Sequence, residues 1–269
     1  MVIFQNDIIS STINLENIMD KELRGKFISQ WQTYFPNAEL PVTFQYSDDS
    51  MGVEKEKIFE GQRCIFAQLA KVRRGESICM QNESVNCRGG KRYLGFSQTL
   101  FPGFECFLSH DEAGEGERYK RTPELVTECM KHLPFIPVKK NIIFKRWDRL
   151  TEEDAPMAVI FFANPDVISG LFTLACFNSA APDAVITPFG AGCASIVYYP
   201  YREELNGTKR AVLGLFDPSA RKCVKGDLLT FAIPFSKFAE MINEMEDSFL
   251  ITNSWSIIRG RMGKINQIE

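Results

Sequence analysis

The chain begins with a helical pattern and then alternates between strand-like and helix-like stretches. Apolar side chains recur every three or four positions over residues 14–35, which predicts an amphipathic helix that Pro36 ends. Residues 41–46 are rich in β-forming side chains and predict a strand. Residues 61–74 again have a helical pattern, and Gly75 suits the position just after a helix end. The N-terminal part therefore predicts helix, strand and helix in turn.

The same alternation continues to the C-terminus. The strands expected there are 77–80, 104–109, 141–145, 157–163, 184–187, 210–216 and 227–233. The helices expected are 122–132, 166–178, 236–245 and 253–262, with short helical turns beginning near Cys87 and near Cys193, the second ending before Pro200. Strand 158–162 is apolar throughout, as in sheets whose two faces are both covered. This order favours an α/β fold.

The elements expected in residues 41–109 recur in the same order in residues 157–216. Each stretch contains a strand, a helix, a strand, a glycine-rich turn with a cysteine, and another strand. We therefore expect mixed sheets with helices, in which two pseudo-repeated halves pack as one compact unit. An ordinary alternation of helices and strands would give the same order without duplication. The expected divisions are an N-terminal amphipathic helical segment 1–36, a first α/β half 37–150 and a second α/β half 151–269.

The composition is that of an ordinary globular protein, with 45% apolar and 24% charged residues. A net charge of −3 argues against a dedicated nucleic-acid binder, which would carry a basic surface. No apolar stretch approaches the ~18 residues of a membrane span, and the first residues lack the basic region of a secretory signal. We expect a soluble protein without a nucleic-acid or membrane partner.

The chain has eight cysteines and two histidines, and these numbers limit the kinds of metal and catalytic site that it can form. Most of the cysteines lie within apolar segments, where cysteine acts as a small hydrophobic residue, and this indicates a reducing, cytoplasmic compartment. Two histidines exclude a zinc site of the HExxH type and leave few ways to build a Ser/His/Asp triad.

Several short motifs occur in a characteristic order. They are Pro41-Val-Thr-Phe, Ala67-Gln-Leu-Ala, Arg73-Arg-Gly-Glu, Cys87-Arg-Gly-Gly, Ala163-Asn-Pro, Gly192-Cys-Ala and Ile233-Pro. In order and spacing they resemble the family catalogued as domain of unknown function 169, over residues 40–250. The resemblance implies a prokaryotic cytoplasmic protein and brings no activity, because that family has none assigned. Where the family often has Cys-Pro-Gly-Gly, this chain has an arginine, Arg88, in second place.

The first candidate site consists of Cys64, Cys87 and Cys193. Cys87 and Cys193 are each expected beside glycines at the start of a short helix, where backbone N–H groups and the helix dipole favour a thiolate. Arg88 and Arg92 would add positive charge near Cys87, which makes Cys87 the expected nucleophile. Three thiolates facing one cleft could hold an iron–sulfur cluster or a zinc ion. The chain has no CxxC pair, so structural cysteines at tight junctions are the alternative.

The second candidate is the turn that contains Gly190, Gly192 and Ser195, which partly matches the dinucleotide pattern GxGxxG. Asp217 ends the following strand at a suitable distance to meet a ribose. Pro200 limits the helix after the turn, so binding of some other anion by backbone N–H groups is the favoured form of this hypothesis. The ligand-binding residues expected at the two turns are Arg88, Gly89, Gly90, Arg92, Gly190, Gly192 and Ser195.

The third candidate is His110, which stands among acids and glycines in segment 109–117 and could act as an acid–base group or a metal ligand. A solvated acidic loop is the alternative. His132 is expected as a favourable charge at a helix C-terminus.

Together these features predict a small-ligand or cofactor-binding protein with a cleft near the Cys87 and Cys193 turns. One alternative is a thiolate or iron–sulfur/zinc-dependent enzyme that uses Cys64, Cys87 and Cys193. The other is a non-catalytic interaction module, for example a homodimer that pairs through the helix in residues 1–36. Whether the chain is an enzyme stays open at this point.

Overall fold

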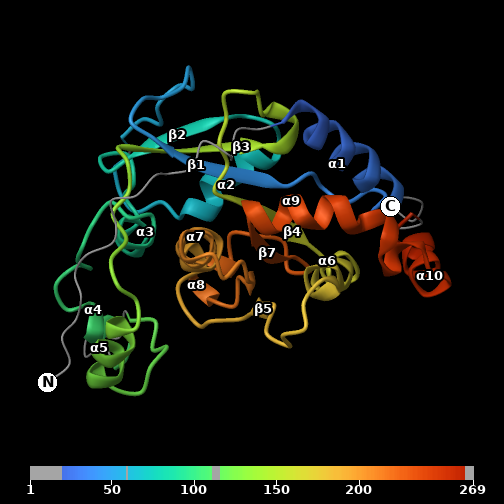
Figure 1. Cartoon of the computed structure of the whole chain (residues 1–269). Coiled ribbons are helices and arrows are strands. Elements are labelled where there is room, and N and C mark those ends of the chain that lie inside the picture. Colours follow the sequence, from blue (N-terminus) through green and yellow to red (C-terminus); the bar gives the residue numbers. More distant parts are fainter. Residues whose placement is uncertain (1–19, 59, 111–115, 264–269) are drawn as a thin grey trace, which may run out of the picture.

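The computed structural model describes residues 20–58, 60–110 and 116–263, and these contain one mixed sheet with helices on both faces. The sheet order is β2-β3-β1-β4-β7-β6-β5, and neighbouring strands are antiparallel except for the parallel pair β5–β6 (Figure 1). The strands are β1 Val42–Ser47, β2 Ile78–Gln81, β3 Asn141–Arg146, β4 Ala158–Ala163, β5 Val185–Ile186, β6 Ala211–Gly214 and β7 Leu229–Pro234. The expected α/β class is confirmed.

Successive side chains of each strand point to opposite faces of the sheet, and helices cover both faces. On the first face, Phe44 of β1 and Ile160 of β4 share one core with helices α2, α3 and α7 and the π-helix η3. On the second face, Val159 and Phe161 of β4 share another core with α1, α6, α9 and α10. The bounds of these helices are α2 Ile65–Arg73, α3 Arg88–Tyr93, η3 Ala194–Tyr198, α7 Tyr199–Asn206, α1 Lys21–Tyr34, α6 Pro165–Phe177, α9 Phe235–Glu244 and α10 Asn253–Met262. Two covered faces explain the apolar sequence of β4.

The N-terminal helix α1 is part of the second core. Asp20 caps its first turn by accepting a hydrogen bond from the Glu22 N–H, and the expected residues 14–19 lie outside the described part of the chain. Phe27 is fully buried, with its ring centroid 4.9 Å from that of Trp147 and 5.0 Å from that of Phe238 in α9. The apolar face of α1 is therefore part of the chain's own core. Pairing with a second chain through residues 1–36 stays a prediction, because residues 1–19 lie outside the described part of the chain.

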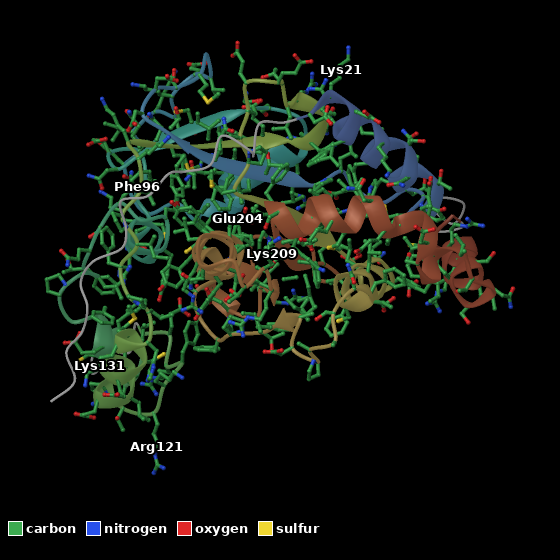
Figure 2. The ribbon with its side chains drawn as sticks, viewed as in Figure 1. Lys21, Phe96, Arg121, Lys131, Glu204 and Lys209 are labelled. Atoms are coloured by element: carbon green, nitrogen blue, oxygen red, sulfur yellow. The ribbon has the colours of Figure 1, made fainter. Side chains whose placement is uncertain are left out.

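Two short helices, α4 Phe104–Phe107 and α5 Pro123–Lys131, pack against each other beside the first face. Figure 1 shows them set apart from the sheet, and Figure 2 places Arg121 and Lys131 at this outlying part of the molecule. The predicted strand 104–109 is wrong. Gly103, at φ 79°, turns the chain into a helix, and the phenylalanines then face a pocket rather than a neighbouring strand.

A second correction concerns the helix predicted to end before Pro200. Helical structure runs through η3 into α7, and Pro200 is the second residue of α7, directly after the π-helical turn, so the proline does not end the helix. The remaining short elements are η2 Trp147–Arg149, α8 Pro218–Arg221, η4 Met245–Asp247 and η5 Phe249–Ile251. None of the helices in the described ranges is long and apolar enough to cross a membrane.

The two expected halves contribute adjoining parts of the sheet. Strands β2, β3 and β1 belong to the first half and β4, β7, β6 and β5 to the second, and the two parts join where β1 pairs with β4. Their helices are placed differently, because α2 covers the first face and α6 covers the second. Since 104–107 is helical, its expected correspondence with strand 210–216 also fails. The division at residues 36 and 150 stays a prediction.

Candidate functional site

A pocket of about 330 Å³ lies where α2, α3 and η3 begin, beside the α4–α5 pair. We call it the cysteine pocket, because Cys64, Cys87, Cys129 and Cys193 all line it. Its volume is within the range of small-molecule sites. The structure thus brings the three predicted cysteines to one cavity, together with a fourth that the sequence did not single out.

Each of the three predicted cysteines directly precedes a helix. Cys87 precedes α3 and Cys193 precedes η3, as expected, and Cys64 precedes α2 although the sequence placed it inside that helix. Within the described residues, however, no three His, Cys, Asp or Glu side chains form a group that could hold a metal ion. The geometry therefore supports a shared cavity and gives no support to an iron–sulfur or zinc site.

Cys87 has the local geometry that was predicted, but its surroundings shift its pKa in the opposite direction. The Gly90 N–H donates to Cys87 Sγ at 3.3 Å. A Cβ on Gly90 would lie 2.9 Å from the Cys87 Cβ, so only glycine lets this turn close. Burial nevertheless raises the pKa of Cys87, outweighing the N–H groups of Gly90 and Gly89. This shift favours the neutral thiol over the predicted thiolate, and Cys87 as a nucleophile stays a prediction.

The other two thiols are also neutral. Burial raises the pKa of Cys64 to about 12, against a hydrogen bond from the Phe66 N–H that acts to lower it. Cys193 is buried, and burial raises its pKa well above the ordinary value. The cavity therefore presents uncharged, polarisable sulfur to whatever occupies it.

Arg92 does not supply the positive charge expected beside Cys87. It is buried, it donates to the Leu133 carbonyl oxygen at 2.6 Å, and its guanidinium lies 5.5 Å from the centroid of the Phe135 ring. These contacts tie α3 to the segment after α5. The side chain of Arg88 lies outside the described part of the structure.

Asp217 is the polar centre of the pocket wall. It is 3% exposed and accepts hydrogen bonds from the Gly192 N–H at 2.8 Å and the Tyr119 O–H at 2.6 Å. It also accepts from the Ser219 N–H at 2.9 Å and the Ser219 O–H at 2.8 Å. Leu215, just before it, has a φ of 70°, so the backbone turns sharply to bring Asp217 under the Gly192 turn. Asp217 is thus committed to protein donors and is not available to a ribose.

In the second turn, Gly192 is required by close packing, whereas Gly190 has room for a side chain. A Cβ on Gly192 would lie 2.5 Å from the Ala220 Cβ, and one on Gly190 would lie 3.4 Å from the Ala194 Cβ. Ser195 is buried and donates to the Gly192 carbonyl oxygen at 2.7 Å, which closes the turn. The Gly192 N–H is already paired with Asp217, so this amide is not available to an anion, and anion binding at the turn stays a prediction.

The histidines lie away from the pocket. His110 is exposed and is not among the lining residues, and part of its acidic segment, 111–115, falls outside the described residues. His132 follows the last turn of α5, at the helix C-terminus where it was expected.

The aromatic wall of the pocket was not predicted from the sequence. Its rings are Phe66, Tyr93, Phe101, Phe104, Phe107, Tyr119 and Phe189. The spacing of residues 101, 104, 107 and 108 is that of one helix face, and this signal was available in the sequence.

Charged groups gather at the edge of the cavity. Lys120 Nζ lies 5.0 Å from the Phe189 ring centroid, and Lys222 is exposed. Neither lysine forms an ion pair with a carboxylate of the described ranges. The two lining carboxylates, Glu117 and Asp217, lie 2.9 and 2.6 Å from the Tyr119 hydroxyl. Arg63 also lines the pocket. Among the described residues, the pocket thus combines an apolar interior with two lysines that have no carboxylate partner.

Neither the curated proteins nor the solved structures include a match to this chain. A family model does match, over residues 36–244, and it carries the description "Uncharacterised ArCR, COG2043". The matched region contains all the walls of the cysteine pocket and the strands from β1 to β7. The chain therefore belongs to the family of domain of unknown function 169.

Proposed function

We propose that this protein binds a small organic anion with a largely apolar body in the cysteine pocket. The observation that carries the proposal is the cavity of about 330 Å³, walled by aromatic rings and neutral thiols, with Lys120 and Lys222 at its edge. Such a pocket, mostly apolar with a few placed polar groups, is typical of small-molecule sites.

The apolar wall selects the body of the ligand. Phe101 packs edge-on against Phe104 and Phe107, with centroid distances of 6.4 and 5.6 Å, so these rings support one another. Burial of ligand surface here contributes roughly 25 cal/mol per Å² of apolar area. Aromatic edges and thioether or thiol sulfur make favourable contacts with a planar ring, which favours an aromatic or unsaturated body.

The lysines select a negative head group. An ammonium without a carboxylate partner next to an apolar cavity gains an ion pair when an anion binds, at a site less screened than open water. Asp217 does not compete for them, since it is satisfied by backbone and hydroxyl donors.

Binding is favoured over thiolate catalysis because the pKa of each predicted cysteine is raised. A nucleophilic cysteine needs a lowered pKa or an adjacent base, and His110 is not a pocket residue. We extend the proposal to a cytoplasmic location, which is consistent with eight free cysteines.

The test is a thermal-shift and calorimetric screen with aromatic carboxylates, each paired with its neutral amide. A carboxylate at 100 times its Kd should stabilise the protein by about 2.7 kcal/mol, and its amide by less. Cys129→Trp, which fills the cavity from α5, should abolish binding. Leu125→Trp is the matched control, because Leu125 is exposed on the same helix and does not line the pocket. If no carboxylate stabilises the wild type, or if Cys129→Trp binds as well, the proposal fails.

A further inference from the structure

Glu117 is a carboxylate of the cysteine pocket that lacks a cationic partner. It lines the cavity and is partly exposed, and it forms no ion pair with any basic side chain of the described ranges. Its Oε2 lies 2.9 Å from the Tyr119 hydroxyl oxygen. The way in which Tyr119 uses its hydrogen therefore decides whether Glu117 is satisfied by the protein.

The Tyr119 hydroxyl has one hydrogen and two carboxylates beside it. Its oxygen lies 2.6 Å from Asp217 Oδ1, and it accepts the Ser219 N–H at 3.1 Å. Burial and the hydrogen bond to Asp217 raise the pKa of Tyr119, so the hydroxyl keeps its hydrogen at neutral pH. The shorter distance assigns that hydrogen to Asp217. Glu117 Oε2 then faces a lone pair of the tyrosine oxygen, with no hydrogen between them.

An oxygen pair of this kind needs a donor from outside the protein. An ammonium group fits best, because it brings N–H donors and also the positive charge that Glu117 lacks. A hydroxyl group would supply a hydrogen and leave the charge of the carboxylate unpaired. The geometry around Tyr119 thus favours a ligand that carries a protonated amine.

The chain segment that contains Glu117 also presents a cation to the pocket. The Glu117 N–H donates to the Phe107 carbonyl oxygen at 2.8 Å, and the Lys120 N–H donates to the Leu108 carbonyl oxygen at 2.9 Å, so the end of α4 holds both residues. Lys120 Nζ lies 5.0 Å from the Phe189 ring centroid. One carboxylate and one ammonium thus come from residues 117–120. A ligand that meets both must carry its own opposite charges close together at one end.

We propose that the cysteine pocket binds an aromatic α-amino acid as its zwitterion. The ammonium group pairs with Glu117, the carboxylate pairs with Lys120, and the ring lies among the aromatic side chains of the wall. This inference rests on the proposed function and names the ligand class, because the carboxylate is the negative head group already assigned to the lysines.

The test measures the contribution of the amine by calorimetry. L-Phenylalanine and L-tryptophan are each compared with the analogue that lacks only the amine, 3-phenylpropanoate and indole-3-propanoate. At least one amino acid should bind the wild type about tenfold more tightly than its analogue, as expected for a hydrogen bond between charged groups.

Glu117→Gln should reduce this preference severalfold, because a neutral acceptor makes a weaker bond to an ammonium group, and should leave the Kd of the analogue no weaker. The new NH₂ group can donate to the Tyr119 oxygen, so the urea midpoint of the ligand-free variant should not fall below that of the wild type. Glu105→Gln is the matched control, because Glu105 lies in α4 and does not line the cysteine pocket. It should keep the wild-type preference.

The outcomes separate the two proposals. If the analogues bind as tightly as the amino acids, or if Glu117→Gln keeps the wild-type preference, the amino-acid proposal is overturned and the binding of an organic anion stands. If neither the amino acids nor their analogues bind, both proposals fail.

Discussion

The hydrogen bonds to Asp217 make Asp217→Asn a sharp test of the pocket architecture. The substitution keeps the shape of the side chain and exchanges one acceptor oxygen for an NH₂ group. If the remaining oxygen stays with the Ser219 and Tyr119 donors, the new NH₂ faces the Gly192 N–H, and two donors oppose each other in a buried site. A lost hydrogen bond to a charged acceptor together with an unpaired buried donor costs about 2–4 kcal/mol. The opposite amide orientation leaves three donors unpaired and costs more.

Urea unfolding followed by circular dichroism measures this loss as a lower midpoint at an unchanged slope. Asp227→Asn is the control, because Asp227 is exposed in the same part of the chain. Tyr119→Phe removes one donor, and a double-mutant cycle with Asp217→Asn should give a coupling of about 1 kcal/mol. A stability of Asp217→Asn within about 0.5 kcal/mol of the wild type, the size of an ordinary surface change, would refute the reasoning.

Three further predictions concern other parts of the molecule. Asp154 is fully buried and pairs with Lys145 at 2.8 Å. Asp154→Asn leaves the buried charge of Lys145 uncompensated, so it should lower the free energy of unfolding in urea by about 3–5 kcal/mol. Gly192→Ala should cost about 1–3 kcal/mol, measured in the same way, because its Cβ would lie 2.5 Å from another carbon. Because the pKa of Cys87 is raised in the folded state, its contribution to stability is present at neutral pH and is lost as the pH rises through the folded pKa. The alkylation rate of Cys87, followed by mass spectrometry, should therefore still rise above pH 9, and a plateau near neutral pH would contradict this expectation.

The sequence predicted the fold well where periodicity and caps agree. Strand 157–163 and helix 166–178 correspond closely to β4 and α6, which Asn164 caps by accepting from the Val167 N–H. The strand prediction for residues 104–109 was wrong because their apolar run fits a strand or a buried helix equally well. Only the turn at Gly103 decides between them. The order of strands in the sheet depends on long-range pairing, such as that of β1 with β4, which no local pattern contains.

The candidate site was predicted in part. The glycines beside Cys87 and Cys193 correctly indicated helix starts, and the three cysteines do share one cavity. The partner Tyr119 could not be predicted, because it meets Asp217 through a contact between distant segments.

The raised pKa values of the cysteines show what a local motif leaves out of account. The N–H groups at the start of a helix stabilise the thiolate of a cysteine that precedes it. The sequence reveals this stabilisation because it depends on a few adjacent residues. The cost of burying the thiolate depends on everything that surrounds the sulfur, including α5 and the Gly192 turn, and here it is the larger of the two. The same burial that suppresses nucleophilicity makes the cavity apolar, so the feature that argues against a thiolate enzyme is the one that favours a binding site for an apolar ligand.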